Sequence, residues 1–186
     1  MNVYDFDKTI YDGDCTVDFY FYCLKHHPYI ATHIFRQSYG ICLHTISKID
    51  TTTMKEYFFS FLSDLKQPES CVDAFWDSHQ HKIKDWYLNK KTAQDLIISA
   101  SPLFLIAPIC HRLGVAKPIA SLIDIRSGKF NGVNCKGQEK VFQFYQRFPN
   151  GEIDQFYSDS LSDAPLAKIA REAYLVKGSE LISWQT

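Results

Sequence analysis

The stretch MNVYDFDKT, residues 1–9, decides how this chain is expected to fold. Residues 2–6 form a short apolar run that predicts a buried strand. Asp5 and Asp7 stand two positions apart at its end, so their side chains share one side of an extended chain. Like charges this close repel each other unless a cation or a shared proton compensates. The stretch therefore predicts a strand that delivers two carboxylates to a reactive site, although a polar turn with Asp7 as a helix cap has the same pattern.

Beyond this strand, short apolar runs alternate with helical patterns towards the C-terminus. Further strands are predicted at residues 96–98, 118–124, 153–157 and 173–176, and helices at 103–113, 138–148 and 163–171. Residues 128–135, with glycines at 128 and 132, predict a hairpin or a bulged ribbon. This alternation favours an α/β fold with a mostly parallel sheet that is covered on both faces.

Residues 15–92 differ from the rest because they contain no convincing strand and at least three amphipathic helical patterns. These patterns lie at residues 17–24, at 54–65 after a capping box of Thr53 and Glu56, and at 72–87 after Pro68. An insertion directly after the first strand would lie over the carboxyl ends of the strands, where open α/β sheets bind ligands. We therefore predict a core of residues 1–14 and 93–186, with residues 15–92 as a helical cap and candidate lid.

The composition is that of one globular domain with a substantial insertion. Of 186 residues, 46% are hydrophobic and 22% are charged, which excludes a disordered or low-complexity chain. The formal net charge is -1, so no nucleic-acid partner is expected. The six cysteines stand singly, and no run reaches the ~18 apolar residues of a transmembrane segment. Because no signal-peptide pattern is evident, we expect a cytoplasmic protein, and the sequence leaves its oligomeric state open.

Three more groups of polar residues follow the later predicted strands, and the first of them could bind phosphate. Ser99, with Ala100 and Ser101, stands between a strand and a helix. A hydroxyl and free backbone amides at such a position can bind a phosphate group. The same residues also suit an ordinary helix start, because Ser101 directly precedes Pro102.

The second group contains two lysines and the third contains two aspartates. A cation from Lys136 or Lys140 could offset charge on a nucleophile and on a transferring phosphoryl group, whereas most lysines on helices are simply solvated. Asp159 could bind Mg²⁺, which prefers oxygen ligands, while Asp163 orients a water molecule or a lysine. Helix capping by Ser162 and Asp163 would explain the last group without any chemistry.

All four groups lie just past the carboxyl ends of separate predicted strands, which in a doubly wound sheet form one crevice. Together they supply a nucleophile, an acid/base, a phosphate-binding group, a cation and metal ligands. Four unrelated structural roles explain this set less well than one site does. We therefore expect the four groups to converge around a single divalent ion.

In order and content these motifs resemble those of the haloacid dehalogenase-like hydrolase superfamily, specifically its phosphoserine-phosphatase-like branch. DFDKT at 5–9 is similar to the first motif, the run ending in SASP at 99–102 to the second, NCKGQEKV at 134–141 to the third, and SDSLSD at 158–163 to the fourth. SASPLFLIAPICHRLG at 99–114 is especially close to that branch. The resemblance covers essentially the whole chain and implies a Rossmann-like core with a helical cap at 15–92.

The resemblance also implies a role for each motif residue. These roles are Asp5 as nucleophile, Asp7 as acid/base and, through its backbone carbonyl, as metal ligand, Ser99 with Ala100 and Ser101 in phosphate binding, Lys140 as the charge-neutralising lysine, and Asp159 with Asp163 at the magnesium ion. Spacing back from Asp159 would favour Lys136 as the active-site lysine, but the Gly-x-x-Lys pattern favours Lys140, which we predict.

Several positions support or depart from the family pattern. Thr9 completes the first motif as a supporting residue. Lys8 and Ser158 stand where many members have glycine, and neither change removes a reacting group. Asp14 lies where phosphoserine phosphatases carry an acidic substrate-recognition residue. No cap arginine for a substrate carboxylate is evident, so phosphoserine itself is not predicted.

Together these observations predict a magnesium-dependent phosphomonoester hydrolase that acts through an aspartyl-phosphate intermediate on a small phosphorylated metabolite. A second candidate is a phosphatase for lipid phosphates such as phosphatidylglycerophosphate, with weak lipid contact through the cap. The apolar surface of the cap that contacts the lipid would comprise residues 19–22, Tyr29, Phe35 and Tyr39. A phosphotransferase is a third candidate. A non-catalytic metal- or phosphate-binding module is the fourth, and the intact pair of Asp5 and Asp7 disfavours it.

Overall fold

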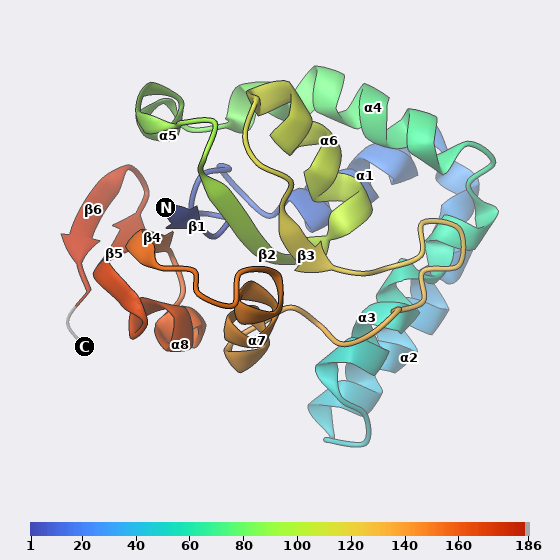
Figure 1. The fold of residues 1–186 in the computed structure, drawn as a ribbon. Helices are drawn as coiled ribbons and strands as arrows, with labels where there is room; N and C mark the ends of the chain where they lie inside the picture. Colours follow the sequence, from blue (N-terminus) through green and yellow to red (C-terminus); the bar gives the residue numbers. More distant parts are fainter. Residues whose placement is uncertain (185–186) are drawn as a thin grey trace.

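The computed structural model describes residues 1–184 and contains a six-stranded sheet with the strand order β3-β2-β1-β4-β5-β6 (Figure 1). The strands are β1 (Val3–Tyr4), β2 (Leu96–Pro102), β3 (Ile119–Ser121), β4 (Ile153–Ser158), β5 (Ala170–Lys177) and β6 (Glu180–Ser183). Every neighbouring pair is parallel except β5 and β6, which are antiparallel. The α/β class with a mostly parallel sheet is therefore confirmed.

Helices cover both faces of the sheet. Successive side chains of a strand point to opposite faces, so neighbouring residues of β1 pack against different helices. Val3 belongs to an apolar cluster with Phe144 of α7 (Gln138–Arg147) and Leu166 of α8 (Ala164–Ala167). Tyr4 belongs to a second cluster with Leu105 of α6 (Leu103–Leu113). In Figure 1, α7 and α8 lie on one side of the sheet, and α5 and α6 on the other. The central strand β1 is thus buried from both directions, as its apolar sequence predicts.

Residues 15–92 fold into helices that are inserted between β1 and β2. They comprise α1 (Cys15–His26), α2 (Ile34–Thr45), α3 (Thr51–Phe58), α4 (Pro68–His79) and α5 (Asp85–Lys90), with short 3-10 helices at Pro28–His33, Phe59–Asp64 and Gln80–Lys82. Phe19, Phe61 and Trp76 share the apolar cluster of Tyr4, so this segment packs directly on the sheet layer. The antiparallel pair α2 and α3 extends away from the sheet (Figure 1). Within residues 1–184, no helix combines the length and apolar character needed to cross a bilayer.

The structure corrects two predicted elements near the C-terminus. The helix predicted at 163–171 is wrong beyond Ala167, because Ala170 already pairs with Ile153 in the sheet. The strand β6 was absent from the predicted elements, because its four residues are all exposed and show no apolar alternation. A Gly-Ser pair at 178–179 turns the chain between β5 and β6, and Gly178 has a φ of 63°. This Gly-Ser pair is a hairpin signal from which β6 could have been predicted.

Two further expectations change in detail. Asp50, not Thr53, caps α3, and its carboxylate accepts a hydrogen bond from the Thr53 backbone N–H at 2.7 Å. The predicted capping box is therefore wrong, and Glu56 instead accepts a hydrogen bond from the Phe130 backbone N–H at 2.9 Å. The ribbon predicted at 128–135 forms only an isolated antiparallel bridge between Ile123 and Phe130.

Candidate active site

The site begins where β1 ends, at the point where the order of the strands reverses. The chain proceeds from β1 to β2 and β3 on one side and then places β4 on the other side of β1. Ligands bind at such switch points, outside the carboxyl ends of the strands. Asp5 follows β1 directly, and its backbone N–H donates to the Tyr157 carbonyl at 2.8 Å. This hydrogen bond extends the β1–β4 pairing and fixes the backbone from which the Asp5 side chain projects.

The turn after Asp5 is held in an uncommon conformation. Lys8 has a φ of 57°, in the left-handed region that costs a non-glycine residue about 1–2 kcal/mol. This geometry explains why glycine suits the same position in the resembled motif. The Lys8 backbone N–H donates to the Gly13 carbonyl at 2.9 Å, while Ile10 and Tyr11 are fully buried. The neighbouring core thus stabilises a strained turn that carries both carboxylates, as is common at functional sites.

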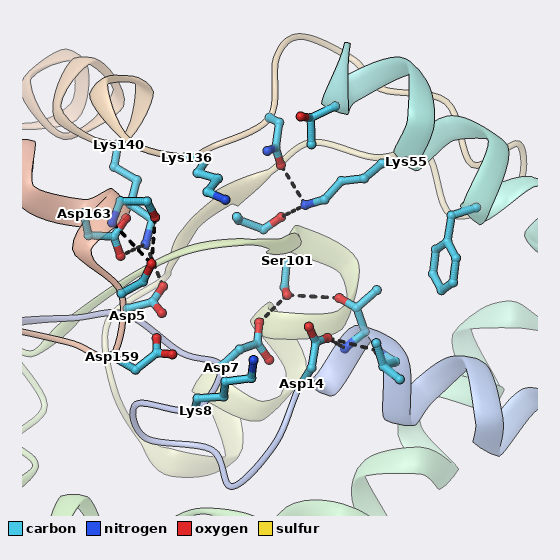
Figure 2. A pocket seen from close by; sticks show the side chains of 18 of the residues that line it. Asp5, Asp7, Lys8, Asp14, Lys55, Ser101, Lys136, Lys140, Asp159 and Asp163 are labelled. Carbon is cyan, nitrogen blue, oxygen red and sulfur yellow. Dashed lines mark hydrogen bonds and ion pairs between the residues drawn. The ribbon is translucent and has the colours of Figure 1, made fainter. Parts of the chain in front are cut away.

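Lys140 is the lysine that reaches Asp5. Its Nζ lies 2.6 Å from Asp5 Oδ1 and 2.7 Å from Asp163 Oδ2, and the lysine side chain is only 2% exposed (Figure 2). Burial alone would lower the pKa of Lys140, but the two carboxylates outweigh it and hold this pKa above its ordinary value. Lys136 makes neither contact and lies elsewhere along the cavity wall. The prediction based on the Gly-x-x-Lys pattern therefore selects the lysine that contacts Asp5.

The fourth motif supports this buried cluster. Asp163 is 2% exposed, and its Oδ2 also accepts a hydrogen bond from the Ser158 hydroxyl at 2.8 Å. The serine that replaces a frequent glycine is thus used to hold Asp163. Asp159 follows β4, and its backbone N–H donates to the Thr9 hydroxyl at 2.9 Å. Thr9 is fully buried, and this hydrogen bond connects the first motif to the fourth.

Two carboxylates of the site have oxygens available for a ligand. Asp5 Oδ1 contacts Lys140, while Asp5 Oδ2 and the Asp159 carboxylate accept no hydrogen bond from another residue between 1 and 184. Burial raises the pKa of both Asp5 and Asp159, although Lys140 opposes this effect at Asp5. A cation between the two carboxylates would stabilise their charged forms. In the described part of the chain no three His, Cys, Asp or Glu side chains form a metal-binding group. However, two carboxylates with a backbone carbonyl fit Mg²⁺, which commonly keeps waters and phosphate oxygens as its other ligands.

The Asp7 side chain points towards the inserted helices and not towards Asp5. Its Oδ1 accepts from the Cys15 backbone N–H at 2.7 Å, and its Oδ2 accepts from the Ser101 hydroxyl at 2.5 Å. Burial raises the pKa of Asp7, and the nearby charge of Asp14 adds to the effect. Asp14 Oδ1 itself accepts from the first backbone N–H groups of α1, so it acts as a helix cap. A carboxyl group with a raised pKa beside a cavity can exchange a proton with a ligand.

The residues predicted to bind phosphate divide into two sets. Ala100 and Ser101 line the cavity, whereas Ser99 does not. Ser99 is 1% exposed, and its hydroxyl accepts a hydrogen bond from the Ser101 backbone N–H at 3.0 Å. Ser99 therefore holds the irregular end of β2, and of the two serines only Ser101 presents its hydroxyl to Asp7.

One cavity of about 380 Å³ joins these groups to the inserted helices. Its core end contains Asp5, Asp7, Asp159, Asp163 and Lys140, with Lys136 and Asp14 alongside (Figure 2). Its opposite end is lined by the apolar side chains of Val17, Met54 and Phe58. This volume is in the range of small-molecule pockets. The cavity thus combines a charged end for a small anion with an apolar end for an organic group.

Lys55 is a cavity residue that the sequence analysis missed. Its Nζ donates to the Ala100 carbonyl at 2.9 Å and to Asn134 Oδ1 at 2.8 Å, so α3 is bound to the end of β2 and to the loop before α7. Burial lowers the pKa of Lys55, and the carboxylates of Asp14 and Asp7 oppose this shift. The helical pattern of α3 gives no signal for this role, because a polar position on an amphipathic helix normally faces solvent.

Comparisons with known proteins agree with this fold. The family model for the haloacid dehalogenase-like hydrolases matches residues 3–168. Among curated proteins, no sequence matches this chain.

Solved structures show the same fold in proteins of low sequence identity. A protein of unknown function from Bordetella pertussis Tohama I is similar with a TM-score of 0.73 and 18% identity, over 94% of this chain and 88% of that one. A phosphoserine phosphohydrolase-like protein from Francisella tularensis subsp. tularensis SCHU S4 has a TM-score of 0.57 and 16% identity, over 94% of this chain and 87% of that one. A phosphoserine phosphatase solved as an analogue of its phospho-aspartyl intermediate has a TM-score of 0.53 and 17% identity, over 93% of this chain and 84% of that one. These neighbours include the branch that the motifs resemble.

Proposed function

The chain belongs to the haloacid dehalogenase-like hydrolase family, and we propose that it is a phosphomonoester hydrolase with Asp5 as its nucleophile. The observation that carries the proposal is the buried bridge of Lys140 between Asp5 and Asp163. It holds one oxygen of Asp5 and leaves the other free at the cavity. A carboxylate held in this way can attack phosphorus while the adjacent cation offsets the added negative charge.

In the proposed first step, Asp5 Oδ2 forms a bond to phosphorus and the bond from phosphorus to the leaving oxygen breaks. Asp7, whose pKa is raised by burial, donates its proton to that leaving oxygen and releases an alcohol. In the second step, Asp7 takes a proton from water as the water oxygen attacks the aspartyl phosphate. The bond between phosphorus and Asp5 then breaks, which restores the carboxylate and releases inorganic phosphate.

The remaining residues position the reacting groups. Ser101 and Lys136 line the cavity near Asp7 and Asp5, and we assign them to the phosphate oxygens. Asp5 and Asp159, with the backbone carbonyl of Asp7, would hold Mg²⁺. When bound, the ion would neutralise phosphate charge and favour in-line attack. The leaving group would occupy the apolar end of the cavity.

The direct test is hydrolysis of p-nitrophenyl phosphate by the purified chain with Mg²⁺. Asp5→Asn should reduce kcat by at least about a thousandfold, because the amide cannot act as the nucleophile. Asp12→Asn is a matched control, since Asp12 is exposed in the same loop and does not line the cavity. Chelation of divalent ions should abolish activity, and added Mg²⁺ should restore it. Retained turnover in Asp5→Asn contradicts the proposal.

The acceptor and the substrate class require separate measurements. Release of phosphate with and without added alcohols distinguishes hydrolysis from phosphoryl transfer, and we expect water to be the acceptor. For the substrate we propose a small phosphorylated metabolite. The apolar lining by Val17, Met54 and Phe58 favours a lipid phosphate as the second candidate. A higher kcat/KM for a monomeric short-chain lipid phosphate than for glycerol phosphate would favour that second class.

A further inference from the structure

Away from the cavity, α2 presents apolar side chains to solvent. The residues are Ile34, Phe35, Tyr39 and Ile41 of the helix and Ile46 directly after it, here called the α2 apolar face, and their exposed fractions range from 52% to 83%. At 3.6 residues per turn they share one side of the helix. The other residues on that side are uncharged: Ser38, Cys42 and Thr45. A surface helix of a globular protein normally has the opposite arrangement, with its apolar side inward.

The inward side of α2 is polar and is held in place by specific contacts. Gln37 is buried, and its side chain accepts from the Tyr20 hydroxyl at 2.9 Å and donates to the Phe58 carbonyl at 3.0 Å. Gly40 lies so close to α3 that an added Cβ would be 2.4 Å from Tyr57 Cβ. Rotation of α2 would break both hydrogen bonds and place a side chain where only glycine fits. The outward direction of the α2 apolar face is therefore specified by packing.

The charged residues of the sequence segment that contains α2 are all basic, whereas Glu56 lies on the adjacent α3. Residues 19–49 contain no Asp or Glu, although an even spread of the chain's 21 acidic residues would place about three or four among these 31 positions. Lys25, Arg36 and Lys48 all lie in this segment and are exposed. The chain as a whole has a formal net charge of -1, so this positive charge is local.

We propose that the α2 apolar face is a docking surface for a membrane that contains anionic phospholipids. Apolar side chains on one side of a helix enter the boundary between headgroups and acyl chains, and neighbouring lysine and arginine side chains attract anionic lipid. A second copy of this chain would be a poor partner, because docking two such faces would bring like charges together. Docking in the plane of the membrane also requires no spanning helix.

The test is flotation of the whole chain with vesicles of phosphatidylcholine and phosphatidylglycerol, compared with vesicles of phosphatidylcholine alone. We expect binding to the anionic vesicles, with weaker binding at high salt because salt screens the basic residues. Phe35→Ser should weaken binding by about tenfold, since Phe35 is the most exposed member of the face at 83%. Phe142→Ser is the matched control, because Phe142 is also exposed but belongs to α7.

Charge variants test the second half of the proposal. Lys25→Glu and Lys48→Glu should each weaken binding to anionic vesicles by at least about fivefold. Circular dichroism and the urea midpoint should match the unaltered chain, so loss of binding cannot be assigned to unfolding. Absence of binding to anionic vesicles overturns the proposal, as does an equal loss in Phe142→Ser. A concentration-dependent dimer that Phe35→Ser dissociates, without vesicle binding, would overturn it in favour of self-association. The measurement does not depend on catalytic activity.

Discussion

The core end of the cavity and the α2 apolar face depart from ordinary packing in opposite ways. Lys140, a charged residue, is 2% exposed, whereas Phe35, an aromatic residue, is 83% exposed. Charged side chains are almost never buried unless they are paired, and large apolar faces are seldom left to solvent. At Lys140, two carboxylates compensate the buried charge within the chain. On α2, the rest of residues 1–184 leaves more than half of each apolar side chain exposed. The buried site is thus completed within the chain, whereas the α2 apolar face requires an outside partner.

The largest expected effect tests the internal compensation. Lys140→Met should lower the free energy of unfolding by about 3–5 kcal/mol, because it leaves Asp5 and Asp163 buried together without their cation. It should also abolish hydrolysis of p-nitrophenyl phosphate. Urea denaturation followed by circular dichroism measures the first effect.

Lys136→Met is the control for that variant, because Lys136 lies nearby without an ion pair to either aspartate. Its free energy of unfolding should change by less than about 0.5 kcal/mol. Equal destabilisation by the two substitutions would contradict the special position of Lys140.

An intermediate effect on stability is expected where the inserted helix α3 contacts the sheet layer. Lys55→Met should lower the free energy of unfolding by about 1–3 kcal/mol and raise KM, since it removes both hydrogen bonds from α3 to β2 and to the loop before α7. Lys129→Met removes the more exposed ion pair with Glu56, at the same junction, and should cost about 0–1 kcal/mol. Denaturation curves and initial rates on p-nitrophenyl phosphate check both variants. A larger effect from Lys129→Met would mean that the surface pair holds the junction.

The smallest effect is expected on the α2 apolar face. Phe35→Ala should change the free energy of unfolding by less than about 0.5 kcal/mol, because the ring is already in water. Phe61→Ala, by contrast, removes a fully buried ring of the inserted helices and should cost about 3–5 kcal/mol. Urea midpoints of the two variants give the comparison. Strong destabilisation by Phe35→Ala would show that the face contributes to folding instead of docking.

Much of the fold could be predicted because its signals are local. Apolar runs identified the strands around Tyr4, Ile97 and Phe156, and Gly114 correctly ended the helix at Leu113. The errors occurred where tertiary pairing overrides local pattern. Residues just beyond Ala167 suit a helix, but β4 offers them a paired edge from Ala170 onward. Such competition between local preference and sheet pairing is not visible along the sequence.

The sequence predicted which aspartates gather at one cavity, but not their detailed contacts. Asp5, Asp7 and Asp159 line one cavity, as their positions after separate strands predict. The choice between Lys136 and Lys140 required the direction in which α7 presents each side chain. The Ser99 hydroxyl is buried and holds the irregular end of β2, and it is the Ser101 hydroxyl that contacts Asp7.

The sequence by itself determined the order of the strands and helices up to β4, the motifs and the absence of acidic residues from 19–49, because these are properties of neighbouring residues. Only the tertiary structure decided that Lys140 joins Asp5 to Asp163, that Lys55 crosses to Ala100, and that α2 turns its apolar side outward. Each of these depends on contacts between segments far apart in the chain. Their geometry follows from how buried side chains pack together, and periodicity along one segment does not contain that information.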